Sequence, residues 1–208
     1  MMVIHTLTLG MFAVNNYLIH PPNSSKAILI DACEDYPAIL QKIEDLNLEL
    51  VYLINTHGHG DHIAGNKPII EATGAKLCIH HLEAPYLEDP QLNLSGWMGA
   101  RLQSPQPDQL LEEGDEISLE GISLKVLHTP GHTPGHITLV GDGVAFVGDV
   151  IFRESIGRTD FPGGSYEQLI ETIQTKIYSL PDDMILYNGH GPHTTVAHEK
   201  HFNPFVRG

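Results

Sequence analysis

The segment THGHGDHIAG, residues 56–65, combines three histidines and an aspartate in the spacing HxHxDH. On an extended chain, His57 and His59 project to the same side and can bind one metal ion. Once the chain turns, Asp61 and His62 can point past that ion to a second one. Imidazole and carboxylate are ligands that zinc, iron and manganese accept. A lone HxH pair is a weak signal, but the full spacing predicts a metal site.

Other segments supply the same ligand types, again where predicted strands end. The sequence HTPGHTPGH places His128, His132 and His136 in a Gly/Pro turn. Asp149 closes the strand VAFVGD, and His190 lies in YNGHGP. Spacing alone does not decide which of the three histidines in the turn is a ligand. The alternative is that these histidines lie on the surface and bind no metal. The additional segments make that alternative a poor explanation of the pattern.

Two halves of the chain that resemble each other could bring these residues together. In the first half, the strand ILID and a helix precede the strand VYLINTH; in the second, VAFVGD and a helix precede ILYNGH. In both halves an Asp ends one strand and a Gly/His-rich segment ends the strand after the helix. Two such halves would pack sheet on sheet with helices outside. The sequence therefore predicts an α/β (α+β) fold, a four-layer αββα sandwich with the ligands along one edge.

The expected elements follow from the apolar patterns and the turn residues. The predicted helices cover 35–48, 62–74 and 165–180, and Ser165 can cap the last of these. The long segment 82–114 is predicted to be a loop, either a lid over the site or a plain surface insertion. The predicted strands cover 3–9, 15–20, 26–32, 49–57, 76–81, 122–129, 136–143, 144–152 and, as the last strand, 184–190.

Two glycines and one aspartate in or near the ligand segments have expected roles other than binding the metal. Gly58 and Gly60 are predicted to let the backbone wrap closely around the ion. Asp31 occupies in the first half the place that Asp149 occupies in the second. It is either a carboxylate that orients a metal ligand or an ordinary turn residue.

Composition and charge restrict the classes of function. With 208 residues, 41% apolar and 18% charged, the chain is expected to form one globular domain over 1–208. A formal net charge of −15 argues against nucleic acid and anionic membranes as partners. Cys33 and Cys78 are expected to be buried free thiols, and no segment has the pattern of a signal peptide or a membrane span. We therefore expect a cytoplasmic protein, whose oligomeric state the sequence does not indicate.

The order HxHxDH, GHTPGH, GD, GH resembles the metallo-β-lactamase-fold hydrolases, from the first strand to about residue 195. The segments SIGRTDFPGGS and GHGPHTT…NPF extend the resemblance to the short, single-domain relatives of glyoxalase II, hydroxyacylglutathione hydrolase. The resemblance implies two divalent metal ions, with zinc expected and iron or manganese as alternatives. It assigns one metal to His57, His59 and His132, the other to Asp61, His62 and His190, and a bridging position to Asp149.

The resemblance also implies a reaction. The expected substrate is a small-molecule thioester, an S-(2-hydroxyacyl)glutathione such as S-lactoylglutathione, hydrolysed by a hydroxide that bridges the metals. Asp61 and Asp149 would be the carboxylates closest to the chemistry. Arg158 lies where relatives carry a basic residue that meets glutathione, although an ion pair with Asp160 is an alternative. Only 18 residues follow His190 (208 minus 190), so the C-terminal helical glutathione-binding domain of larger glyoxalase II enzymes is expected to be absent.

Other functions are weaker candidates. Persulfide dioxygenases share the fold and a similar GRTDF segment, but use one iron and oxygen. Hydrolysis of other thioesters or of lactones would use the same ligands. A metal-dependent binding protein without activity is a further alternative. The sequence has no GxSxG motif and no GxxxxGK[ST] motif, which argues against serine hydrolases and P-loop enzymes.

Overall fold

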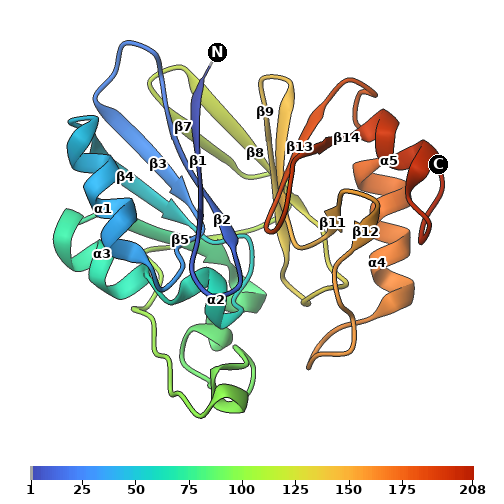
Figure 1. The fold of residues 1–208 in the computed structure, drawn as a ribbon, viewed down its shortest axis with the longest axis horizontal. Helices are drawn as coiled ribbons and strands as arrows, with labels where there is room; N and C mark the ends of the chain where they lie inside the picture. Colours follow the sequence, from blue (N-terminus) through green and yellow to red (C-terminus); the bar gives the residue numbers. More distant parts are fainter. Residues whose placement is uncertain (1) are drawn as a thin grey trace.

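A computed structural model of the chain describes residues 2–208, and Figure 1 shows two six-stranded sheets packed face to face with helices outside. The first sheet has the strand order β1-β2-β3-β4-β5-β6, and the second has β14-β13-β10-β9-β8-β7. Helices α1 and α3 cover the first sheet, whereas α4 and α5 lie on the second (Figure 1). The predicted αββα sandwich is therefore confirmed.

The first sheet carries its helices within the N-terminal half of the chain. Its strands are β1 (Val3–Leu9), β2 (Val14–His20), β3 (Lys26–Ile30), β4 (Glu49–Ile54), β5 (Lys76–His80) and β6 (Gln109–Leu111). The helices of this half are α1 (Tyr36–Asp45), α2 (Gly60–Ile63), α3 (Asn66–Thr73) and the 3₁₀ turns η1 (His81–Leu87) and η2 (Ser95–Met98).

The second sheet occupies the C-terminal half. Its strands are β7 (Glu116–Leu119), β8 (Ile122–His128), β9 (Ile137–Gly141), β10 (Val144–Gly148), β13 (Ile185–Asn188) and β14 (Thr194–Thr195), with a separate hairpin of β11 (Ile151–Phe152) and β12 (Ser155–Ile156). The helices of this half are α4 (Tyr166–Thr172), the π-helical turn η3 (Ile173–Ile177) and α5 (Val196–Phe202).

Apolar side chains fill three layers between these elements. Residues such as Ile28 and Phe146 pack between the sheets, with side chains that are fully buried. Ile39 and Ile43 of α1 pack on the outer face of the first sheet, as the predicted helical face requires. The stripe of α4 and η3, which includes Ile173, packs on the second sheet. Within residues 2–208, every helix is too short or too polar to cross a lipid bilayer.

The predicted pairing of the halves has a geometrical consequence for the site. Strands β3 and β4 are parallel, and so are β10 and β13. The carboxyl ends of parallel neighbours lie at the same edge of a sheet, where ligands of α/β sheets usually bind. Backbone hydrogen bonds join the two sheets at this edge: the amide of Ile137 donates to Thr56 O at 2.9 Å, and that of Asn15 to Gly189 O at 2.8 Å. The edge is therefore one continuous platform.

Several short elements differ from the sequence-based expectation. The segment 82–114 contains η1, η2 and the edge strand β6, so it is not a plain loop. Strand β7 was not predicted either. The prediction that 184–190 is the last strand is wrong, because β14 pairs with β13 and leads into α5. These strands have two to four residues, too few to display a period-two pattern.

Candidate metal centre

All seven predicted ligands lie at one edge of the sandwich, although they come from distant parts of the chain. His57 and His59 follow β4, and Asp61 and His62 lie in α2 directly after them. The remaining three follow strands or lie between strands of the second sheet: His132 lies between β8 and β9, Asp149 follows β10, and His190 follows β13.

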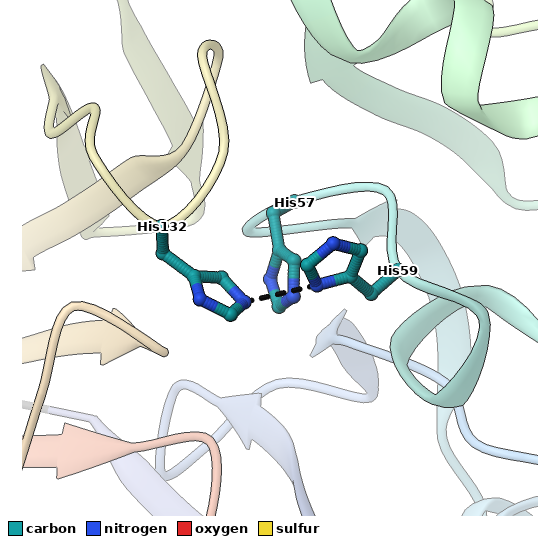
Figure 2. A group of neighbouring side chains, drawn as sticks. All are labelled: His57, His59 and His132. Carbon is teal, nitrogen blue, oxygen red and sulfur yellow. Dashed lines mark hydrogen bonds between the residues drawn. The ribbon is translucent and has the colours of Figure 1, made fainter. Parts of the chain in front are cut away.

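The first group consists of His57, His59 and His132, whose rings converge (Figure 2). Their ligating nitrogens lie within 4.8 Å of one another. The Nδ1 atom of His59 is 2.9 Å from the Nε2 atom of His132. All three side chains are buried, with exposed fractions of 0–3%. Three neutral imidazoles held this way form the kind of site that binds a transition metal.

The second group consists of Asp61, His62 and His190. The Nε2 atoms of the two histidines are 3.3 Å apart, and Asp61 Oδ2 is 3.5 Å from that of His190. Asp149 lies between the groups. Its Oδ1 is 3.5 Å from His62 Nε2, and its Oδ2 is 3.7 Å from His132 Nε2. One carboxylate thus reaches both groups, which is the position required of a bridging ligand.

Three buried polar atoms at this centre have no hydrogen-bond partner: His57 Nε2, His59 Nε2 and Asp149 Oδ1. An unpaired buried acceptor is costly, and in native proteins such atoms need an explanation. A metal ion bound between the groups would satisfy His57 Nε2 and Asp149 Oδ1, whereas His59 Nε2 lies on the side of its ring away from the Nδ1 atom that faces His132. The donor set of imidazoles and carboxylates therefore fits divalent ions of the zinc, iron or manganese type.

Carbonyl and carboxylate oxygens hold the opposite ring nitrogens of three histidines. His62 Nδ1 donates to Asp31 Oδ2 at 2.9 Å, His132 Nδ1 to Arg158 O at 2.7 Å, and His190 Nδ1 to Phe12 O at 2.9 Å. Each bond fixes the tautomer and turns Nε2 toward the centre. The structure thus places Asp31 in the orienting role, the first of its two interpretations, and the sequence did not indicate the two backbone carbonyls.

The two groups differ in their electrostatics. Burial lowers the pKa of His59 to about 3 and that of His57 well below its ordinary value, so the first group is neutral. Burial also opposes protonation of His62, but Asp149, Asp61 and Asp31 outweigh it and raise its pKa. The same carboxylates, Asp149 and Asp61, outweigh burial and raise the pKa of His190. In the metal-free protein, protons therefore compensate the carboxylates of the second group.

Metal binding to the second group should release protons. Because the carboxylates raise the pKa values of His62 and His190, this pair carries at least one additional proton at neutral pH, which a metal ion must displace. The apparent metal affinity is therefore expected to rise as the pH increases from 6 to 8. Isothermal titration in buffers of different ionisation enthalpy measures the proton number directly. An affinity that is independent of pH, with no proton released, would contradict this account.

The Asp31→Ala variant should bind its second metal about 10–100-fold more weakly, as expected when the group that orients a ligand is removed. Asp31 also holds the loop before His57: it accepts from Thr56 N and from Thr56 Oγ1, each at 2.8 Å. Metal titration of the variant, beside an exposed control such as Asp183→Ala, checks the effect. Equal affinities in the variant and the wild type would show that Asp31 is only a turn residue.

The glycines of the ligand loop have another role than the predicted one. A Cβ on Gly58 would lie 2.3 Å from Tyr86 Cβ, and one on Gly60 would lie 3.0 Å from Asn93 O. Both neighbours belong to the segment 82–114. The glycines therefore leave room for this segment to pack on the ligand loop. The structure does not support the predicted role, in which they let the backbone approach an ion closely.

One buried residue that the sequence did not indicate joins the ligand loops. Glu83 in η1 is fully buried, and its two carboxylate oxygens accept from Gly58 N at 2.8 Å and Gly135 N at 2.7 Å. Gly58 lies between two predicted ligands, and Gly135 lies three residues after His132. Burial raises the pKa of Glu83 to about 7. No sequence signal separates this residue from the exposed acids of the chain.

The other histidines of the turn have different surroundings. His136 is fully buried, and its Nε2 accepts from the backbone N–H of Asp149 at 3.0 Å. His128 stacks on His80 with ring centroids 4.5 Å apart, and its Nε2 pairs with Pro134 O. His132 is the one that joins the predicted ligands, whereas His136 positions the backbone of Asp149.

A cavity of about 430 Å³ opens above the centre. Six large apolar side chains line it, together with Arg158 and five of the predicted ligands: Phe12, Leu94, Trp97, Met98, Phe152 and Phe161. Arg158 makes a bidentate ion pair with Asp160 at 2.7 and 2.9 Å and lies 4.1 Å from the ring centroid of Phe161. The ion pair with Asp160 is therefore present, and Arg158 also lines the cavity, whereas its contact with a substrate stays a prediction.

Comparisons with known proteins agree with this fold and centre. The model of the metallo-beta-lactamase superfamily matches residues 9–190. A hydroxyacylglutathione hydrolase of Haemophilus influenzae, GloC, is 37% identical over 209 residues, which covers 99% of this chain and 98% of the relative. The chain belongs to the metallo-beta-lactamase superfamily.

Two solved structures are similar to this chain over nearly its whole length. The BLEG-1 B3 metallo-beta-lactamase is 32% identical with a TM-score of 0.95, over 99% of this chain and all of the other. TTHA1623, solved in a di-iron-bound form, is 33% identical with a TM-score of 0.87, over 97% of this chain and all of the other. The fold and the ligand types are therefore those of a metallo-hydrolase, and the relatives' names differ in substrate and metal.

Proposed function

We propose that this protein is a binuclear metal-dependent thioester hydrolase of the glyoxalase II type. The observation that carries the proposal is the placement of Asp149 between two three-residue ligand groups. The 37% identity to the GloC hydrolase supports the choice of S-(2-hydroxyacyl)glutathione as the substrate class.

When bound, two divalent ions would supply a hydroxide at neutral pH and stabilise negative charge on the substrate's carbonyl oxygen. The residues of the chain position the reaction. The ligand atoms of both groups point toward the centre of the site. The first group is neutral, hydrogen bonds orient His62 and His190, and Asp149 lies between the groups. Phe161 and Trp97, whose ring centroids are 5.8 Å apart, form an apolar wall that limits water around the reacting bond. A thiolate leaves without strong acid assistance, which is why a thioester suits a site without a separate proton donor.

The test is hydrolysis of S-lactoylglutathione by protein reconstituted with zinc, iron or manganese, with metals per chain measured on the same sample. Efficient turnover with about two metals per chain is the expected result. If both sites are filled and no thioester is hydrolysed, the proposal is wrong.

The main rival is a persulfide dioxygenase with one iron. It requires oxygen consumption with glutathione persulfide and a single iron per chain. The ligand set does not separate the two enzymes, because dioxygenases of this fold keep the same ligand types; the GHGPHTT ending of this chain favours the hydrolase. An assay of nitrocefin hydrolysis on the same preparation distinguishes a β-lactamase from both the thioester hydrolase and the dioxygenase.

A further inference from the structure

A second cavity, of about 270 Å³, adjoins the one above the metal centre. The two share four lining residues: Phe12, Gly60, Asp61 and Met98. Asp61 belongs to the second ligand group, so the second cavity begins beside that group and leads away from it. We call it the side groove.

The side groove is apolar on both walls. One wall is the turn between β1 and β2, with Met11 and Phe12, and the other is formed by Met98 at the end of η2 and by Ala100 and Leu102 after it. The side chains of Met11 and Met98 are 86% and 55% exposed to solvent. Large apolar side chains exposed together at the mouth of a groove mark a surface that binds a ligand. Methionine side chains adapt to flexible apolar ligands.

Charge separates the side groove from the rest of the cavity. Of its two acidic residues, Asp61 also lines the first cavity, whereas Glu34, which accepts from Met11 N, lines only the side groove; among the described residues that line the groove, none is Lys or Arg. Arg158 and Phe161 line only the first cavity. An anionic glutathione moiety is therefore disfavoured in the side groove and favoured beside Arg158.

We propose that the side groove binds the acyl part of the thioester, and that this acyl part is an unbranched aliphatic chain of medium length. The inference rests on the proposed thioesterase function and names its substrate class. The scissile carbonyl lies at the metal centre, the thiol part extends toward Arg158, and the chain extends between Met11 and Met98.

The test uses metal-loaded protein and glutathione thioesters of increasing chain length: lactoyl, butyryl, hexanoyl and octanoyl. The value of kcat/KM should rise about two- to fourfold for each added methylene, as expected for burial of CH₂ groups. A value that stays constant or falls from butyryl to octanoyl, with S-lactoylglutathione still hydrolysed, overturns the inference and leaves the proposed function intact.

Two further measurements keep the groove and the reaction apart. Non-hydrolysable S-butyl-, S-hexyl- and S-octylglutathione should bind with a Kd that falls with chain length, whether or not any thioester is turned over. Ala100→Leu narrows the groove at an exposed position and should lower the octanoyl-to-butyryl ratio of kcat/KM at least fivefold. Ala72→Leu, the same change on the exposed face of α3, should leave the ratio unchanged. An octanoyl-to-butyryl ratio that is unchanged in Ala100→Leu would contradict the placement of the acyl chain in the side groove.

Discussion

The Asp149→Asn variant should keep its fold and lose roughly 10²–10³-fold or more in kcat, the scale of losses when a group that stabilises charge at the reacting centre is removed. The carboxylate lies 3.5 Å from His62 Nε2 and His190 Nε2 and 3.7 Å from His132 Nε2. An amide has one acceptor oxygen in place of two, and its NH₂ group would point a donor at a metal position. If two ions bind as proposed, both would lose a ligand at once.

The fold should persist because the backbone of Asp149 is held independently of its carboxylate. Its N–H donates to His136 Nε2 at 3.0 Å, and β10 stays paired with β9 and β13. The assay is turnover of S-lactoylglutathione with metal content and thermal unfolding measured on the same samples, and Asp183→Asn serves as an exposed control. Near-normal turnover by Asp149→Asn would rule out the shared-carboxylate mechanism.

The loss of charge has a second measurable effect. Without the Asp149 carboxylate, the pKa values of His62 and His190 should fall, because it is among the groups that raise both. The metal-free Asp149→Asn variant should then release fewer protons per metal ion bound than the metal-free wild type does. This readout does not depend on the substrate.

The sequence was sufficient to predict the platform and the residues on it. Strand ILID and strand VAFVGD each end in an Asp, and each is followed by a helix and a parallel strand that ends in histidines. Since parallel neighbours bring their carboxyl ends to one edge, the convergence of Asp149 with His57 and His190 follows from topology. The structure brings the ligands together as predicted, and metal binding itself stays a prediction.

The supporting contacts could not be predicted from the sequence. The carbonyl oxygens of Phe12 and Arg158 orient two ligands, but every residue carries a carbonyl, so no residue type marks them. The side groove combines the β1–β2 turn with residues some ninety positions away, and only the three-dimensional packing of segment 82–114 brings the two together. Residue types indicate the ligands, whereas the backbone contacts that aim them depend on the folded chain.

Glu83→Ala should weaken the first metal position more than the second. The variant leaves two buried amides, Gly58 N and Gly135 N, without their acceptor, which costs roughly 1–3 kcal/mol for each. These amides belong to the loops that carry His57, His59 and His132, so the loops can move apart.

The second group should be affected less, because Asp31 and the carbonyl of Phe12 orient His62 and His190 independently of Glu83. Titration of the metal-free protein with cobalt(II), followed by absorption and calorimetry, should show one binding step weakened about 10–100-fold or more and the other nearly unchanged. Glu83→Gln should show a smaller loss, since its amide oxygen still accepts one of the two bonds, and the exposed Glu71→Ala should show none. Equal weakening of both steps would mean that Glu83 supports the fold in general, whereas selective loss of one step would make it the residue that sets the spacing of the first ligand group.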